Sequence, residues 1–93
     1  MSDLSQQINI GKELERKLMD AGIASFAELK NTGSEQAFMR LRAADPGACL
    51  NILCALDGAV VGIRWHDLPA VRKAELKEFH RLLQVPKERH TKA

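Results

Sequence analysis

The sequence predicts an all-α domain, a compact bundle of about five short helices. Its 93 residues are 45% hydrophobic and 28% charged, which is typical of one globular domain with one modest core. Hydrophobic residues recur at helical spacing in several segments, and no segment shows the strict alternation of a strand. Residues that cap or end helices separate these segments.

We expect residues 9–84 to form the domain. Residues 1–8 read as a short N-terminal lead, and residues 85–93 read as a polar basic tail after Pro86 has closed the last helix. No repeat or low-complexity segment divides the chain, so a second domain is not predicted.

The first helix is predicted to begin at Asn9, whose side chain can cap it. Its inner face consists of Ile10, Leu14 and Leu18. Gly22 then supplies a left-handed end, and Ile23 can fold back onto Leu18, which is the Schellman arrangement. This helix end is therefore well specified.

Two short helices follow. The first is opened by the capping box Ser25-Phe26-Ala27-Glu28, buries Phe26 and Leu29, and ends at Asn31-Thr32-Gly33. The second is capped by Ser34 in our prediction. Its inward residues are Ala37, Phe38 and Leu41. Asp45-Pro46-Gly47 is predicted to be a turn.

Residues 48–61 predict a central helix, because they are apolar nearly all round. Gly58 lies inside this helix and has no side chain, so another backbone can approach it there. Gly62 is expected to end the helix.

The last helix is predicted to begin at Asp67 or Leu68, with Pro69 in its first turn. Its inner stripe is expected to be Val71, Leu76, Phe79 and Leu83, and its outward residues Arg72, Lys73, Lys77 and Arg81. Trp65, the single tryptophan, stands before this helix and is interpreted as a core anchor. Arg64 beside it could stack on the ring or pair with an acid.

The residue patterns do not favour an enzyme. Cys49 and Cys54 are five apart on an apolar helix, so they do not share a face and are expected to be buried thiols. His66-Asp67 lacks an accompanying nucleophile, and Asp67 is assigned to capping. The cysteines and His80 lack zinc spacing, and nucleotide-binding loops are missing from the sequence. We predict no metal and no cofactor.

The sequence favours a cytoplasmic protein. The first ten residues have neither the basic nor the apolar region of a secretory signal. The longest apolar stretch, residues 48–63, is interrupted by Asn51 and Asp57 and is too short to cross a bilayer comfortably.

Charge is distributed unevenly along the chain. Residues 1–63 carry six Lys or Arg against eight Asp or Glu, whereas residues 64–93 carry eight against four. A basic C-terminal third is a weak indication of a nucleic acid or an acidic protein partner, and it is also compatible with a solvated helix face.

The turn that opens the first helix can bind an anion, because a helix N-terminus presents unpaired amides and a partial positive charge. Lys12 and Arg16 are four residues apart and project on one side, whereas Glu13 and Glu15 would repel a phosphate. The candidate DNA-phosphate residues are Asn9, Ile10, Gly11, Lys12 and Arg16. A second candidate basic patch comprises Lys73, Lys77 and Arg81.

The sequence resembles two known families. Residues 8–11 and 21–26, together with Leu29, resemble a helix-hairpin-helix unit and the connector after it. In that unit an apolar-Gly-apolar-Gly hairpin holds a DNA phosphate through its amides, and Asn9 stands at the first glycine position here. The closer resemblance is to the C-terminal domain of the TfoX (Sxy) family of bacterial competence regulators. It rests on residues 9–18, 22–23, 28–29, 50–59 and 62–69.

The resemblance implies a small helical bundle related to helix-hairpin-helix domains. It also implies a regulatory module of competence or transcription control with weak, sequence-independent DNA binding. The alternative is a protein-interaction module that binds a transcription regulator or self-associates without touching DNA. The sequence leaves the oligomeric state open.

Overall fold

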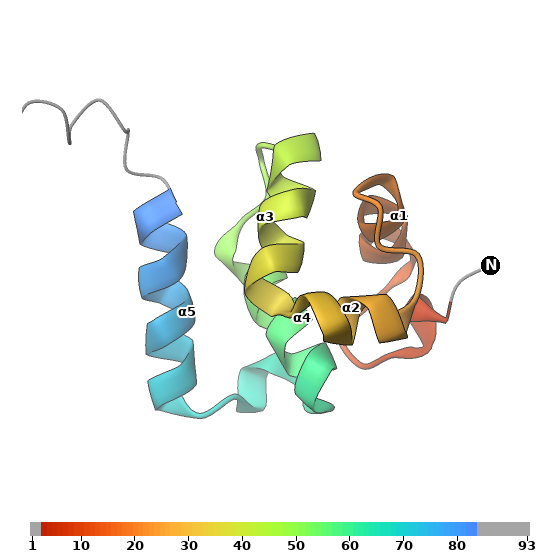
Figure 1. The fold of residues 1–93 in the computed structure, drawn as a ribbon. Coiled ribbons are helices and arrows are strands. Elements are labelled where there is room, and N and C mark those ends of the chain that lie inside the picture. The colour runs from red at the N-terminus through yellow and green to blue at the C-terminus, as the bar shows by residue number, and fades with distance from the viewer. Residues whose placement is uncertain (1–2, 84–93) are drawn as a thin grey trace, which may run out of the picture.

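The computed structural model describes residues 3–83 and is all-α over that range, which confirms the predicted fold class (Figure 1). Its elements are the 3₁₀ turns η1 (Leu4–Gln6) and η2 (Trp65–Asp67), and the helices α1 (Lys12–Asp20), α2 (Phe26–Thr32), α3 (Ser34–Ala44), α4 (Leu50–Val61) and α5 (Ala70–Leu83). The predicted domain end at residue 84, Pro86 and the tail 85–93 lie outside the described residues.

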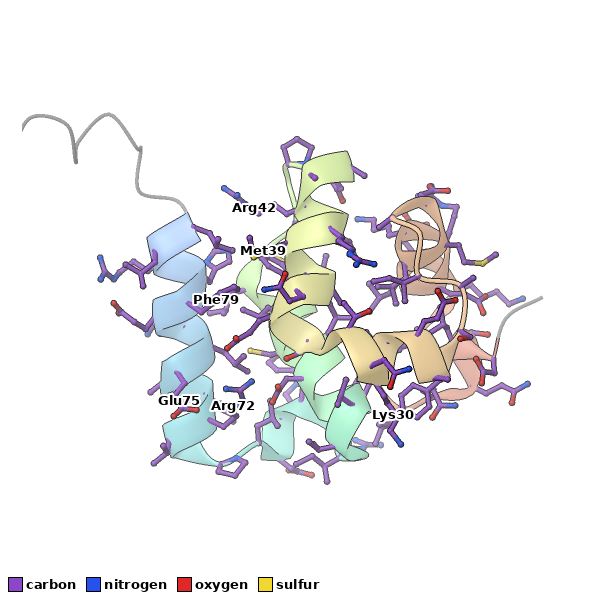
Figure 2. All side chains as sticks on the ribbon, viewed as in Figure 1. Lys30, Met39, Arg42, Arg72, Glu75 and Phe79 are labelled. Carbon is purple, nitrogen blue, oxygen red and sulfur yellow. The ribbon has the colours of Figure 1, made fainter. Side chains whose placement is uncertain are left out.

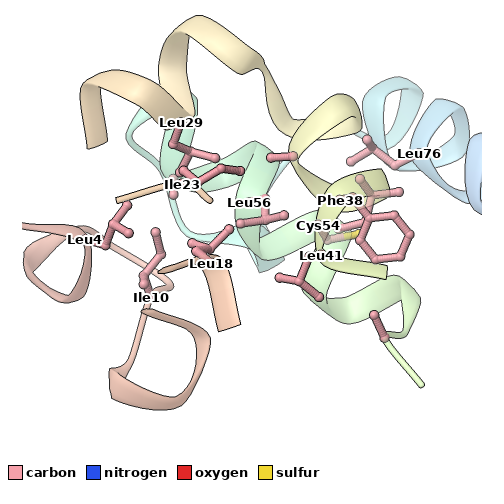
Figure 3. Close-up of a cluster of buried hydrophobic side chains, with 14 of the residues drawn as sticks. Leu4, Ile10, Leu18, Ile23, Leu29, Phe38, Leu41, Cys54, Leu56 and Leu76 are labelled. Carbon is pink, nitrogen blue, oxygen red and sulfur yellow. The ribbon is translucent and has the colours of Figure 1, made fainter. Parts of the chain in front are cut away.

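Helix α4 is the centre of the bundle. It packs against α3, α5 and η2, while α3 also contacts α1 and α2, so that α5 and α1 lie on opposite sides of the molecule (Figure 1). One core runs through these elements (Figure 3). Its large buried side chains include Leu4, Ile10, Leu18, Ile23, Leu29, Phe38, Leu41, Leu53, Leu56 and Leu76. Leu4 shows that the N-terminal lead also contributes to this core.

The predicted end of α1 is confirmed. Gly22 has φ = 90°, its amide donates to Met19 O at 3.0 Å, and the Ile23 amide donates to Leu18 O at 2.8 Å. Leu18 and Ile23 are fully buried, so the apolar contact of the Schellman motif is also present.

The capping box of α2 forms with one change. The Glu28 amide donates to Ser25 Oγ at 3.2 Å, as predicted, but the Glu28 carboxylate accepts from the Ala24 amide rather than from Ser25. The prediction that Ser34 caps α3 is wrong. Gly33 occupies the cap position, and the buried Ser34 hydroxyl donates to Asp57 on α4 instead.

The remaining connections between helices agree with the predictions after α3 and after α4 and differ before α5. Asp45 Oδ1 accepts from the Gly47 amide, which confirms the turn after α3. Gly62 has φ = 85° and ends α4, as predicted. Asp67 does not cap α5, because it lies in η2; the α5 hydrogen bonds begin with the Lys73 amide donating to Pro69 O.

Helix α5 differs from its predicted orientation at two positions. Leu76 is fully buried, and Phe79 and Leu83 are partly buried, but Val71 is 72% exposed. Arg72 was expected to face outward and instead turns toward α4. The reason is a buried acceptor, Asp57, which makes the inner face of α5 partly polar.

The two cysteines also differ. Cys54 is buried, and burial next to Asp57 raises the pKa of its thiol, so it is a poor nucleophile. Cys49 precedes α4 and is exposed, contrary to the prediction that both thiols are buried.

Candidate nucleic-acid interface

The turn before α1 has a left-handed residue at its centre. Asn9 has φ = 72°, the only positive φ of a non-glycine residue among residues 3–83. Asparagine adopts this conformation more readily than most residues, so Asn9 replaces a glycine here without breaking the turn. The prediction that Asn9 caps α1 is wrong, because Gly11 occupies the cap position.

The Asn9 side chain turns inward and ties the turn to the far end of α4. Its Nδ2 donates to Ile63 O at 2.8 Å and to Ala55 O at 3.4 Å, and its Oδ1 accepts from the Trp65 amide at 3.2 Å. This contact is possible because Gly58 has no side chain: a Cβ there would lie 2.5 Å from Asn9 Nδ2 and 2.6 Å from Ile63 O.

The opening of α1 leaves backbone amides accessible. Gly11 has no side chain with which to cap the helix, and a Cβ built on it would meet nothing within 4 Å. The Ile10 amide is used by Gln7 O, and the first intrahelical bond runs from the Glu15 amide to Gly11 O. The amides between them are those that the start of any helix leaves without an intrahelical partner.

The two predicted phosphate-binding side chains differ in availability. Lys12 is exposed and makes no ion pair or hydrogen bond through its side chain within residues 3–83. Arg16 is held between Glu13, at 2.6 Å, and Asp20, at 3.3 Å. The bond to Arg16 lowers the pKa of Glu13, and the same bond raises the pKa of Arg16.

Arg64 lies beside this turn, although sequence reasoning considered it only as a partner for Trp65 or an acid. Its two neighbours, Ile63 and Trp65, are the residues whose backbone Asn9 binds, and Arg64 itself is exposed. More than fifty positions separate Asn9 from Arg64, so no local pattern could have revealed this proximity. Trp65 is partly buried and packs on the core, as the sequence predicted.

The second candidate patch lies along one side of α5. Lys73 donates to the carbonyl of His66 in η2 at 2.7 Å, and Arg81 pairs with Glu78. Lys77 is exposed and makes no such contact within the described range. Because η2 contacts both Asn9 and Lys73, it lies between the two candidate patches.

A cluster of charged and polar residues lies elsewhere, between three helices, with Asp57 and Ser34 buried at its centre. Asp57 on α4 accepts from Ser34 at 2.8 Å and from Arg72 at 2.7 and 3.0 Å, and Arg72 also pairs with Glu75 and Glu35. Burial alone would raise the pKa of Asp57, but the hydrogen bonds from Arg72 and Ser34 outweigh burial and lower it. This cluster links α3, α4 and α5, and Arg72 also lines two surface hollows, one beside Ser34 and one beside Asp57 (Figure 2 labels Arg72).

Neither a metal-binding cluster nor a membrane-spanning helix is found in the described part of the chain. Within residues 3–83, no three His, Cys, Asp or Glu side chains gather in a way that could hold a metal ion. None of the helices there has the length and apolar character needed to cross a membrane.

Fold and turn together define a class: a small helical domain in which a left-handed turn at Asn9 is set against a central helix. Comparison with known families is more specific. Residues 1–80 match the model of the TfoX C-terminal domain, and the chain belongs to this family.

A characterised relative supports the assignment. The chain is 34% identical over 71 residues to Protein Sxy of Escherichia coli strain K12, which covers 76% of this chain. The match spans about a third of the length of Sxy, 34% of that protein. TfoX and Sxy form a regulatory family linked to competence.

Solved structures agree with the fold. Two crystal structures of uncharacterised proteins from Listeria monocytogenes, a triclinic and a tetragonal form, are each 51% identical to this chain and cover 87% of it. Their TM-scores are 0.86 and 0.85, and the matches cover 92% and 99% of the Listeria chains.

Proposed function

We propose that this chain is a non-enzymatic regulatory module in the cytoplasm, acting in competence or transcription control and binding DNA weakly without reading its sequence. Membership of the TfoX family supports the regulatory role. The binding site would be the turn Asn9–Lys12, where phosphate oxygens would meet the first amides of α1 and the side chain of Lys12. Arg16 would join them by releasing Glu13 or Asp20.

The observation that carries this proposal is the inward position of the Asn9 side chain. Asn9 keeps the left-handed turn, and its amide is bound to Ile63 and Trp65 instead of covering the entrance of the helix. A phosphate can therefore approach Gly11, where the space beyond the backbone is open.

The test is fluorescence anisotropy of a labelled duplex at about 20 to 200 mM salt. We expect an affinity that is the same for unrelated sequences and falls steeply with salt, because binding releases counterions. Lys12→Glu should weaken binding at low salt about five- to tenfold and reduce the salt slope by about one.

The matched control is Arg40→Glu, which makes the same charge change at an exposed position on α3, away from the turn. It should retain most of the affinity. Absence of binding at the lowest salt would refute the proposal. Equal losses of affinity in the two variants would show that DNA binding depends on net charge and not on the turn before α1.

A second candidate function is a protein-interaction module in which α5 meets a transcription regulator or another acidic surface. It is favoured by the exposed Lys77 and by the basic side of α5 that it shares with Lys73 and Arg81. In a pull-down with DNA-free lysate, Lys77→Glu should lose the regulator, whereas Lys12→Glu should retain it. The opposite result would argue against α5.

A further inference from the structure

The turn η2, which joins α4 to α5 at one end of the bundle, carries two aromatic rings that lie against each other (Figure 1). The ring centroids of Trp65 and His66 are 3.9 Å apart, and their planes are tilted by 30°. Trp65 is partly buried and packs against the core, whereas His66 is exposed. The core therefore holds the indole in place, and the indole supports an imidazole that is open to solvent.

Cations lie beside these rings. Lys73 on α5 donates to the His66 carbonyl at 2.7 Å, which brings its ammonium group next to η2. Arg64, directly before η2, is exposed and makes no ion pair or side-chain hydrogen bond within residues 3–83. Asp67 is the acid of the same turn and is exposed as well. Arg64 and Lys73 together outweigh it, so an anion is attracted to the surroundings of the rings.

The phosphate-binding turn proposed above is the immediate neighbour of η2. Asn9 joins the two, because its Oδ1 accepts from the Trp65 amide at 3.2 Å and its Nδ2 donates to Ile63 O at 2.8 Å. Gly11 and Lys12, which would hold the phosphate, follow Asn9 by two and three positions. An aromatic surface and a phosphate site thus lie side by side on the surface of the domain.

We propose that η2 is a stacking platform for an unpaired nucleobase, so that the chain prefers a single strand of nucleic acid to a duplex. This inference rests on the proposed function, because a phosphate of the same strand would occupy the turn before α1. Each base has a π-face that stacks on aromatic side chains, histidine included.

Stacking explains why the strand must be single. Within a duplex each base is already stacked on its neighbours, so a base has to be unpaired before it can lie on His66. All four bases have a π-face, so the platform does not read sequence and agrees with binding that is independent of sequence. DNA and RNA strands share this chemistry, and the experiment separates them.

The experiment is fluorescence anisotropy with three labelled probes at about 20 mM salt: a DNA strand of mixed sequence, the RNA strand of the same sequence, and the DNA duplex that contains it. We expect at least one single strand to bind about fivefold or more tightly than the duplex, since one stacked base supplies that difference. The tighter of the two strands identifies the natural source of the base.

Two variants of His66 assign the preference to the platform. His66→Val leaves an aliphatic side chain over the indole but no π-face, so it should lose about fivefold or more in single-strand affinity and keep its duplex affinity. His66→Phe is the matched control, since it retains a ring, and it should bind like wild type. Both variants keep the main-chain carbonyl that Lys73 binds, and their melting temperatures verify folding.

Trp65, the single tryptophan, provides a second measurement. A base that stacks on His66 lies next to the indole, so a saturating single strand should change the tryptophan emission of wild type and His66→Phe more than a saturating duplex does. Equal affinity for strand and duplex, equal losses on both probes in His66→Val, or a His66→Phe variant that binds like His66→Val would overturn the platform. Duplex binding would persist in each of these cases, whereas failure of the proposed function would remove binding of every probe.

Discussion

At the scale of single residues, Asn9 shows how one side chain can serve the backbone and the tertiary structure together. Its φ of 72° satisfies the turn, and its amide makes hydrogen bonds to residues more than forty positions away. The sequence indicated the first role through the resemblance to a glycine hairpin. The second role was not predicted: the sequence indicated that the Asn9 side chain caps α1, whereas in the structure it binds Ile63 and Trp65.

Asn9 can be tested by separating these two roles. Asn9→Gly keeps the left-handed turn but leaves Ile63 O and the Trp65 amide without their partner, so we expect a loss of about 2 kcal/mol in the free energy of unfolding. Asn9→Ala should lose about 1 kcal/mol more, because alanine resists a positive φ. Urea denaturation measures both, and a glycine variant as stable as wild type would contradict the role of the side chain.

At the scale of elements, the joint between α4 and η2 depends on Gly58. The sequence predicted that a backbone approaches this glycine, and the structure places Ile63 O and the Trp65 amide against it, together with the Asn9 side chain. The prediction specified a close approach but not its partner, because the partner lies on the turn before α1.

Gly58→Ala is therefore expected to destabilise the protein by about 1–3 kcal/mol, although alanine is the better helix former by about 1 kcal/mol. The added methyl would lie 2.6 Å from a backbone oxygen, so the joint must open. Gly11→Ala is the control and should cost at most about 1 kcal/mol, since open space surrounds it and only the weaker N-cap preference of alanine acts there. Thermal melts monitored by circular dichroism compare the two variants, and equal stability would contradict the predicted clash.

At the scale of the whole molecule, the cluster of Asp57, Arg72 and Ser34 joins α4, α5 and α3. Sequence patterns treated Asp57 as an interruption of an apolar helix, Ser34 as a cap and Arg72 as a solvent-facing cation. All three assignments changed for one reason: a buried carboxylate needs donors, and the packing of three helices brings a guanidinium and a hydroxyl to it.

The cluster predicts how stability depends on pH. The folded state lowers the pKa of Asp57, so its contribution is complete above the unfolded pKa of about 4 and is lost as pH falls below it. Asp57→Asn should destabilise the protein by about 2 kcal/mol at pH 7, because Arg72 loses its main partner. The deficit should shrink as pH falls below about 4 in urea titrations, because the carboxylate is progressively protonated.

Arg72→Met/Asp57→Leu is the control, because removing both charges should cost less than removing the carboxylate alone. A deficit in Asp57→Asn that does not shrink at all as pH falls from about 7 into the acid range would show that the ion pair does not carry the effect.

The sequence by itself determined the helical class, most helix ends and most of the core, because these depend on local features: hydrophobic spacing, a capping box and glycines that accept a positive φ. Tertiary structure alone decided where Asn9, Ser34 and Arg72 point. Each of these side chains has a polar group whose partner is distant in the sequence, and only packing brings the partner within hydrogen-bonding distance. For the same reason, the sequence could predict the turn before α1 as a candidate site. The position of Arg64 next to this turn depends on the fold, because Arg64 is distant from the turn in the sequence.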